Sequence, residues 1–495
     1  MKGFVFGENI ERNETSIRFL AGRAFEALEA KYDLVYVVVG TDQSPGRASL
    51  ENEFAAEHRK LVWVPFYPER FRRWQTLFDV SCILHDDKSS SFAVRNEEGA
   101  REQPAYYARL KKLARQEIYD KHRRSVEENM GLHPDILAPV LRERPDFFIL
   151  PSALLDHVTD DVLQIADALA IPTLLLVAGW DNLSSKGLLY HKPTLVGVWG
   201  EQSKNHAVEV QGIDADRVFS VGAPHYELFR NSEHVDRTPL RQKLGAPQKG
   251  NLLLFAGTLR LFDETQLLEE MDRAIELGTL PPMHVIYRPH PLRSARLHEG
   301  DFFNHEWHHV TMDPQVANSY RTRTQDDFLS RFNHLTHLYR AVDAVVSPMS
   351  TVLLEGMLFG LPTMAVAFGD GKHSWSADKV SRMLHFKELY EVAELLVCRD
   401  RADFFPLLRQ LVSKIGDSAW SAALRQSTAY FVYQDEQSYA DRVLSLVETM
   451  LSRVNQPPIY DSARVKPGKR FVVRNWWLRS RIRKYWRRAV REIVK

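Results

Sequence analysis

The sequence of 495 residues has little cysteine and no long apolar segment. Its two cysteines, Cys82 and Cys398, are far apart and lie in apolar surroundings, which argues against disulfide bonds and against a cysteine-rich zinc site. No stretch approaches the roughly 20 apolar residues of a membrane-spanning helix, and the short apolar run after Met1 is not typical of a signal peptide. We therefore expect a cytoplasmic protein in a reducing compartment.

The net charge of +1 conceals an uneven distribution of charge along the chain. Residues Arg464 to Lys495 contain thirteen lysines and arginines but one acidic residue, a net charge of +12, so the rest of the chain carries −11. We expect an acidic body and a basic C-terminal segment to have different partners. The length predicts two or three domains, which we place at residues 1–232, 233–455 and 456–495.

Both halves of the chain alternate short β-branched runs with helical patterns, which is typical of parallel sheets covered by helices. The polar segment Asn231–Gly250 is predicted to link the two halves. Residues 106–130 and 386–396 are predicted to be helical. The predicted strands comprise residues 2–6, 34–39, 61–64, 146–150, 172–177, 194–199 and 217–221 in the first half, and 252–256, 284–287, 307–312, 342–346 and 363–367 in the second.

The segment Ser347–Thr363, SPMSTVLLEGMLFGLPT, predicts a strand, a turn of small residues and a helix. Ser350 and Thr351 would lie at the helix N-terminus, where free N–H groups and the helix dipole favour an anion. Glu355, one turn further on, is placed to bind two vicinal hydroxyls. The alternative is that Ser350 only caps the helix and that Glu355 is solvated.

A second phosphate-directed motif, Arg288-Pro289-His290-Pro291, follows the predicted strand 284–287. The prolines restrict the backbone, so the arginine fork and the imidazole are held at the strand end, where both suit a phosphate. We expect this motif and Ser350–Thr351 to come from neighbouring strands and to meet in one crevice. The turn Gly257-Thr258, which follows another strand of the series, belongs to the same predicted donor site. A proline-rich turn with surface charges is the alternative.

The densest polar cluster of the first half, Trp180–Gly187, follows a predicted strand and so lies where open α/β sheets bind ligands. Asp181 is the candidate general base, and Lys186 is a candidate partner for phosphate or carboxylate. Trp180 offers a face for sugar stacking, and Asn182 offers a further acceptor contact. An Asx turn with serine caps is the structural alternative. Asp156, which follows a different strand, is a second candidate base.

With its motifs His290-Pro291 and Ser350-Thr351, the region Leu252–Thr363 resembles the donor-binding domain of GT-B glycosyltransferases. It is most similar to bacterial surface-polysaccharide enzymes, namely CMP-sugar transferases of the sialyl- and Kdo-transferase type and CDP-glycerol-type polymerases. The resemblance implies a GT-B fold, in which two Rossmann-like domains face each other across a cleft. The acidic motif of bacterial sialyltransferases is absent, which argues against sialic acid as the donor sugar.

The resemblance also implies roles for individual residues. The two motifs would hold the donor phosphate, Glu355 would bind the donor ribose, and His385 would reach the nucleotide. Glu8, at the end of the first strand, would belong to an acceptor loop. GT-B enzymes generally need no metal ion in the active site, and we expect no cofactor besides the nucleotide sugar that serves as substrate.

Residues 470–495 show a basic amphipathic pattern. Apolar residues recur at helical spacing, tryptophans flank them, and arginines and lysines occupy the remaining positions. This pattern is typical of a helix that lies on an anionic membrane, and we expect peripheral attachment to the inner face of the cell membrane. Binding to nucleic acid and packing on the acidic body are the less favoured alternatives.

The sequence therefore predicts a glycosyltransferase that moves a sugar from a CMP-, CDP- or UDP-linked donor to an acceptor. The acceptor would be a surface polysaccharide, such as lipopolysaccharide or capsule, or a lipid-linked glycan. One alternative is a nucleotide-sugar 2-epimerase, which needs no acceptor. The other is a non-catalytic scaffold that binds nucleotide sugars at the membrane.

Overall fold

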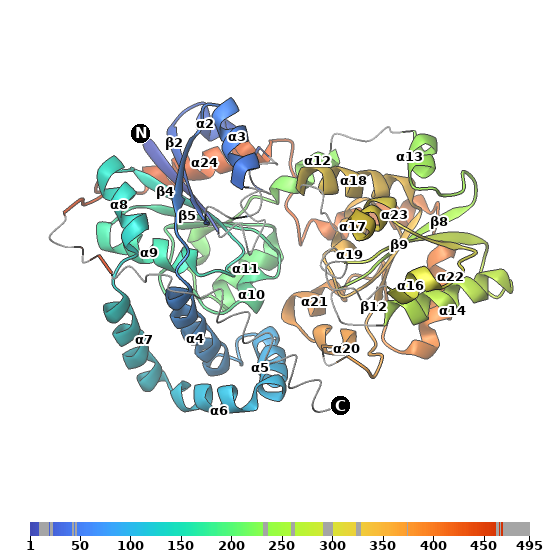
Figure 1. The fold of residues 1–495 in the computed structure, drawn as a ribbon. Coiled ribbons are helices and arrows are strands. Elements are labelled where there is room, and N and C mark those ends of the chain that lie inside the picture. Colours follow the sequence, from blue (N-terminus) through green and yellow to red (C-terminus); the bar gives the residue numbers. More distant parts are fainter. Residues whose placement is uncertain are drawn as a thin grey trace.

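The computed structural model contains two α/β domains, each built on one parallel sheet (Figure 1). The predicted fold class of two Rossmann-like domains is therefore confirmed. The structure describes residues 1–8, 19, 23–41, 44, 47–230, 236–258, 263–290, 300–322, 328–373, 375–461, 465, 467 and 468.

The first sheet has the strand order β3-β2-β1-β4-β5-β6-β7, and every adjacent pair is parallel. Successive side chains point to opposite faces, so Phe148 packs into one core and Ile149 into the core on the other face. Covered faces on both sides explain the uninterrupted apolar run of this strand. The strands are β1 (Lys2–Gly7), β2 (Asp33–Val39), β3 (Lys60–Val64), β4 (Phe147–Ser152), β5 (Thr173–Val177), β6 (Leu195–Val198) and β7 (Val218–Ser220).

Helices cover both faces of the first sheet. α8 and α9 bury Ile136 and Val162 against one face, and α2 and α3 bury Leu28 and Phe54 against the other. Helices α4 to α7 form a separate layer below the sheet in Figure 1, and α4, α6 and α7 share a small core around Trp74. The helices are α2 (Glu26–Glu29), α3 (Arg47–Ala56), α4 (Pro68–Leu84), α5 (Ser90–Glu102), α6 (Pro104–Leu113), α7 (Gln116–Met130), α8 (Pro134–Glu143), α9 (Val158–Leu169), α10 (Asn182–Ser185), α11 (Glu201–Glu209) and α12 (Glu227–Arg230).

The second sheet, also parallel throughout, has the order β10-β9-β8-β11-β12-β13. One face packs against α14 and α22, and the other packs against α13 and α18. The strands are β8 (Asn251–Ala256), β9 (Met283–Arg288), β10 (Val310–Met312), β11 (Ala344–Pro348), β12 (Thr363–Val366) and β13 (Leu395–Cys398). The helices of this half of the chain are α13 (Arg237–Lys243), α14 (Glu264–Glu276), α16 (Gly300–Asn304), α17 (Pro314–Thr322), α18 (Phe328–Ala341), α19 (Val352–Leu358), α20 (Ala377–Val380), α21 (Leu384–Leu389), α22 (Phe404–Ser413), α23 (Ser418–Thr428) and α24 (Tyr439–Ser452), of which α24 packs on the first domain.

Three local predictions differ from the structure. The predicted linker 231–250 contains α13, whose Arg237 and Arg241 each form an ion pair of 2.7 Å with Asp343 and so dock it on the second sheet. The predicted helix 386–396 ends at Leu389, because its apolar end pairs with β12 as the edge strand β13. The predicted helix 106–130 is two helices, α6 and α7.

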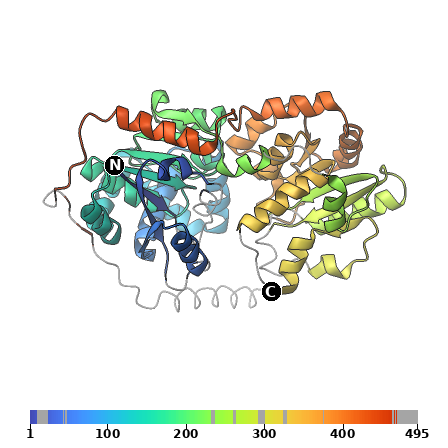
Figure 2. The same ribbon diagram turned by 90° about the horizontal axis from the view of Figure 1, so that it is seen from above.

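The last helix of the body, α24, returns to the first domain (Figure 2). Its buried stripe, which includes Val443, Leu446 and Met450, packs in the same core as Val5 and Leu176 of the first sheet. The predicted second domain, residues 233–455, therefore does not include α24, which belongs to the first domain. The boundary near residue 232 stays a prediction. The chain therefore crosses between the domains twice.

The beginning of the predicted basic tail also lies on the first domain. Val465 is buried in the first core, Ile459 N donates to Leu169 O over 2.7 Å, and Gly468 N donates to Leu132 O over 2.7 Å. The predicted amphipathic helix 470–495 lies outside the described residues. Among the helices that the structure does describe, none combines the length and apolar character needed to cross a membrane.

The packing of α24 predicts that Leu446→Ala destabilises the first domain. Leu446 is buried between α24 and the first sheet, and such truncations cost about 2–5 kcal/mol. Urea unfolding should show the loss. Leu444→Ala, at a half-buried position of the same helix, is the control and should cost clearly less. Equal losses in the two variants would contradict this account of the packing.

Candidate functional site

Each sheet has one point at which the strand order reverses, and loops at the carboxyl ends of the strands there form the usual ligand crevice of such folds. In the first sheet this point lies between β1 and β4. In the second it lies between β8 and β11, which are followed by the turn Gly257-Thr258 and the segment Met349–Thr351.

A cavity of about 460 Å³ lies between the two domains. The first domain contributes residues of the Trp180–Lys186 loop and of α5, and the second contributes residues from Met349–Thr351 and from the region of α20 and α21. The structure thus brings together six predicted site residues from two domains. The lining consists of Arg95, Trp180, Asp181, Ser185, Lys186, Met349, Ser350, Thr351, Trp375, Met383, His385 and Phe386.

Several contacts hold the domains together beside this cavity. Lys379 and Arg382, in and just after α20, form ion pairs of 2.6 and 2.9 Å with Glu98 and Glu97 of α5. Leu384 N donates to Ser91 Oγ over 2.9 Å. Helix α5 was not predicted, because its N-cap Ser89 lies in a segment that reads as a polar loop.

Asp181 is held in a dense network at the first-domain side of the cavity. Its Oδ2 accepts a hydrogen bond from Ser185 Oγ over 2.8 Å and lies 3.2 Å from Lys186 Nζ, while Asn182 Nδ2 donates to Oδ1 over 3.2 Å. Burial opposes ionisation, but the Lys186 cation, the adjacent His385 ring and these donors outweigh it and hold the pKa of Asp181 well below its usual range. This carboxylate stays ionised and is a weak proton acceptor.

His385 forms part of the second-domain wall of the cavity. Its ring packs edge-on against Trp180 at 5.0 Å between centroids, and only 4% of the residue is exposed. Its buried Nδ1 has no hydrogen-bond partner among the described residues. Burial lowers the pKa of His385 to about 4, although Asp181 acts in the opposite direction. The imidazole is therefore neutral at neutral pH.

The turn of hydroxyl residues between β11 and α19 lies where the sequence predicted it. Its serines bond to each other and to β8, and neither is the N-cap residue of α19. Ser347 Oγ donates to Ala256 O over 2.7 Å and lies 2.8 Å from Ser350 Oγ, so the turn is tied to β8. Thr351, at the N-cap position, makes no side-chain capping bond. Both Ser350 and Thr351 are partly exposed and line the cavity.

Trp180 and Asn182 do not present the surfaces that we predicted for acceptor contacts. Trp180 is 3% exposed and packs edge-on against Phe386 and Phe431, so its ring is a wall of the cavity and not an open stacking face. Asn182 is buried in the first turn of α10 and bonds to Asp181. The Asn182 side chain therefore helps to hold the Asp181 carboxylate in position.

Gly257 and Thr258 are bound by a buried carboxylate of their own domain. Glu264 accepts hydrogen bonds from Thr258 N and from Tyr287 OH, both over 2.7 Å. A Cβ at position 257 would lie 2.0 Å from Glu264 Oε2, which explains the glycine. The turn is placed at the switch point as predicted, but neither residue lines the cavity.

Arg288 is engaged inside its own domain, and the phosphate contact that we predicted for it stays a prediction. It is buried and forms an ion pair with the buried Asp313, which also contacts His334 Nε2 over 2.7 Å. Burial opposes ionisation of Asp313, but the Arg288 guanidinium holds its pKa well below the usual range. His290, partly exposed, does not line the cavity either. The strands β9 and β11 that carry the two motifs are separated by β8 and are not neighbours as we expected.

Glu355 and Glu8 are also buried away from the cavity. Tyr339 OH donates to Glu355 Oε2 over 2.5 Å, beneath α19. Glu8 Oε1 accepts hydrogen bonds from Ser152 Oγ, Ala153 N and Leu154 N over 2.6 to 3.1 Å. Glu8 thus braces the loop after β4. Neither carboxylate lines the cavity, and the predicted ribose and acceptor contacts stay predictions.

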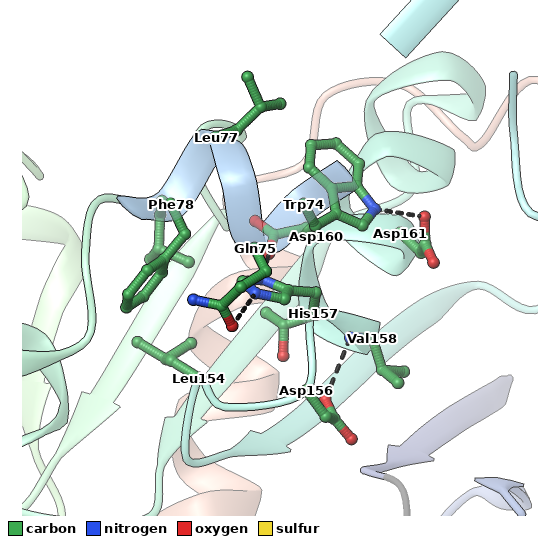
Figure 3. A network of polar contacts seen from close by, with 12 residues as sticks. Trp74, Gln75, Leu77, Phe78, Leu154, Asp156, His157, Val158, Asp160 and Asp161 are labelled. Carbon is green, nitrogen blue, oxygen red and sulfur yellow. Dashed lines mark hydrogen bonds and ion pairs between the residues drawn. The ribbon is translucent and has the colours of Figure 1, made fainter. Parts of the chain in front are cut away.

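Asp156 belongs to a different polar network, under α4 (Figure 3). Its Oδ1 accepts a hydrogen bond from Val158 N over 3.1 Å at the start of α9. The next residue, His157, has a positive φ of 63° and is held by Asp160 Oδ2 at 2.9 Å. This network surrounds a cavity of about 20 Å³, room for about one water molecule. Asp156 does not line the larger cavity with Asp181.

Besides Ser185 and Met349, which lie inside motifs that it singled out, sequence reasoning missed four residues of the cavity: Arg95, Trp375, Met383 and Phe386. They come from segments without a recognisable motif, and only the tryptophan in a polar stretch could have drawn attention. Among the described residues, no group of three or more histidine, cysteine or acidic side chains is arranged to hold a metal ion.

The ion pair of Arg288 predicts a loss of stability in Arg288→Ala. Removal of one partner leaves the buried Asp313 carboxylate uncompensated, which costs about 3–5 kcal/mol at pH 7. The cost should shrink near pH 3, because Asp313 of the variant then takes up a proton while the wild-type carboxylate stays ionised. Urea unfolding at both pH values measures this, with the exposed Arg321→Ala as the control. Unchanged stability combined with weaker nucleotide binding would instead restore a ligand role for Arg288.

The burial of His385 predicts a pH-dependent stability. The folded-state pKa of about 4 lies below the ordinary value of 6.5, so between these pH values the unfolded chain binds a proton that the folded chain does not. Stability therefore falls as the pH drops from 6.5 to 4, by up to about 3 kcal/mol from this residue. His385→Asn should flatten the slope measured by urea unfolding, whereas the control His122→Asn, at a partly exposed position of α7, should not. An unchanged slope in His385→Asn would contradict the buried neutral imidazole.

Comparison with known proteins identifies the fold. No protein-family model matches the sequence, and no curated protein does. A proposed UDP-N-acetylglucosamine 2-epimerase from Listeria monocytogenes matches with a TM-score of 0.51 and 12% identity, over 92% of this chain and 98% of that one. The S. aureus MnaA–UDP co-structure and the UDP-N-acetylglucosamine 2-epimerase from Rickettsia bellii each match with a TM-score of 0.50 and 11% identity, over 92% of this chain and 99% and 98% of theirs. With its two parallel sheets, the chain has the GT-B fold.

Proposed function

We propose that this chain is an enzyme that acts on nucleotide sugars. The leading candidate is a glycosyltransferase that uses a CMP-, CDP- or UDP-linked donor. The observation that carries the proposal is the cavity between the domains. It joins the hydroxyl turn Ser350–Thr351 of one domain to the Asp181–Lys186 loop of the other. An enzyme that brings a donor and an acceptor together needs such a two-sided site.

On the donor side, the hydroxyls of Ser350 and Thr351 and the cation of Lys186 suit the phosphate of a nucleotide. Trp375, which is partly exposed in the cavity wall, offers an apolar face for a base or a sugar ring. We propose these residues for the donor in place of Arg288 and Glu355, whose side chains are engaged in the second domain.

The transfer breaks the bond between the sugar carbon and the phosphate oxygen and forms a bond from that carbon to the acceptor oxygen. The acceptor hydroxyl loses its proton, and the nucleotide leaves. The ion-paired Asp181 is a weak base, so we assign the proton to the neutral imidazole of His385. A bound phosphate favours the imidazolium and so raises the pKa of His385 toward the range useful for proton transfer.

We propose a surface polysaccharide or a lipid-linked glycan as the acceptor. The basic pattern of residues 470–495 supports this, because it suits attachment to an anionic membrane on the cytoplasmic side, where such an acceptor would be presented. The membrane attachment rests on the sequence alone, since these residues lie outside the described part of the chain.

A nucleotide-sugar 2-epimerase is the second candidate. The observation in its favour is that two of the three solved structures above are named as UDP-N-acetylglucosamine 2-epimerases, one of them as a proposed one. An epimerase converts the nucleotide sugar without an acceptor. Conversion of UDP-N-acetylglucosamine by the purified protein alone, followed by NMR, would select this candidate. Binding without any turnover would favour the non-catalytic scaffold.

The donor site predicts selective stabilisation by one nucleotide. In a thermal-shift panel of CMP, CDP, UDP, GDP and ADP, we expect one clear stabiliser. Lys186→Met should weaken its binding about 10-fold or more, because a charge-assisted contact to phosphate is lost. Lys387→Met, at an exposed position of α21 next to the cavity but outside its lining, should bind as the wild type does.

Two outcomes would count against the donor site. If no nucleotide stabilises the wild type, the chain does not bind nucleotide sugars in this form. If Lys186→Met and Lys387→Met both bind the preferred nucleotide as tightly as the wild type, the nucleotide lies outside the cavity.

A further inference from the structure

We infer that Arg95 of α5 forms an oxyanion subsite in the cavity, where it binds a phosphate or carboxylate group of the substrate. The inference deepens the proposed function and rests on it for the identity of the substrate. Arg95 lies in a helix that the sequence did not predict, and no motif pointed to it.

The guanidinium of Arg95 is held in place on two sides. Its Nη1 donates to Ser185 O over 2.6 Å, and its plane lies over the ring of Phe78, 5.3 Å from the centroid. Helix α5 is itself fixed, because Glu98 pairs with Lys379 and Ser91 accepts a hydrogen bond from Leu384 N. An arginine that is anchored in this way loses little entropy when it binds a ligand.

The remaining donors of Arg95 are available. Among the described residues, Nε and Nη2 have no hydrogen-bond partner, and no carboxylate lies within ion-pair distance of the guanidinium. Asp79, on the neighbouring helix α4, accepts hydrogen bonds from Gln75 Nε2 over 2.9 Å and from Tyr106 OH over 2.7 Å. A planar fork with free N–H groups in a cavity suits a two-oxygen anion.

The charges of the cavity favour an anionic ligand. Lys186 and Asp181 lie 3.2 Å apart and largely compensate each other. Arg95 is therefore the uncompensated charge among the described lining residues. His385 also lines this cavity, and its buried Nδ1 has no partner among the described residues. Together these groups predict that binding depends on a negative charge.

Two parts of a nucleotide sugar could supply the oxyanion: the phosphate of the nucleotide or an acidic group on the sugar. Arg95→Gln removes the charge and keeps hydrogen-bonding capacity, and Arg95→Lys keeps the charge but not the fork. Arg109→Gln, at an exposed position of α6, is the control. Calorimetry should compare uridine, UDP, UDP-glucose, UDP-glucuronate and inorganic pyrophosphate for each protein.

We expect Arg95→Gln to weaken binding of the anionic probe about 10- to 100-fold, with Arg95→Lys between it and the wild type and Arg109→Gln unchanged. A loss for UDP and pyrophosphate, but not for uridine, assigns the subsite to phosphate. A loss confined to the preference for UDP-glucuronate over UDP-glucose assigns it to the sugar acid.

The two proposals can fail separately. If the wild type binds a nucleotide and Arg95→Gln binds every probe as tightly, the subsite is overturned and the proposed function stands. If the wild type binds pyrophosphate through Arg95 but no uridine nucleotide and no stabiliser from the panel, the subsite stands and the proposed function fails. If the wild type binds neither pyrophosphate nor any of the nucleotides, both the subsite and the proposed function are overturned.

Discussion

The structure depends on the return of the chain from the second domain to the first. Arg442 of α24 carries this return: its Nε donates to Val221 O over 2.9 Å, and its two other nitrogens pair with Asp435 and Glu227, each over 2.8 Å. Val221 and Glu227 lie in the segment through which the chain first leaves the first domain. The buried guanidinium of Arg442 therefore links that segment to the one through which the chain returns. Beside the cavity, the contacts of α5 with α20 and α21 also join the two domains.

Buried charge serves two different purposes in this molecule. Arg288 with Asp313, and Arg70 with Asp161, are buried ion pairs inside one domain. Removal of one partner of such a pair is strongly destabilising. In the cavity, by contrast, Arg95 and His385 keep polar atoms without partners among the described residues. That difference separates the proposed site from the charged motifs that first suggested one.

Sequence reasoning was most successful where a local pattern was sufficient. The strands of both sheets up to β12 were predicted, because covered parallel strands are continuous apolar runs. The Asp181–Lys186 loop and the Ser350–Thr351 turn were located by their position after such strands. The internal contacts of Arg288, Glu355 and Glu8 were not foreseen, because a sequence does not show that a partner such as Asp313, Tyr339 or Ser152 lies within hydrogen-bond distance.

The sequence by itself determined the alternation of strands and helices, the two sheets and the places where their loops gather, since these follow from periodicity and turn residues along the chain. Only the tertiary structure decided which side chains share a cavity. Arg95 and Ser350 are 255 positions apart, and they line one space because α5 docks on α21 while α24 returns to the first sheet. Contacts of this kind depend on the packing of whole helices, which no local pattern encodes.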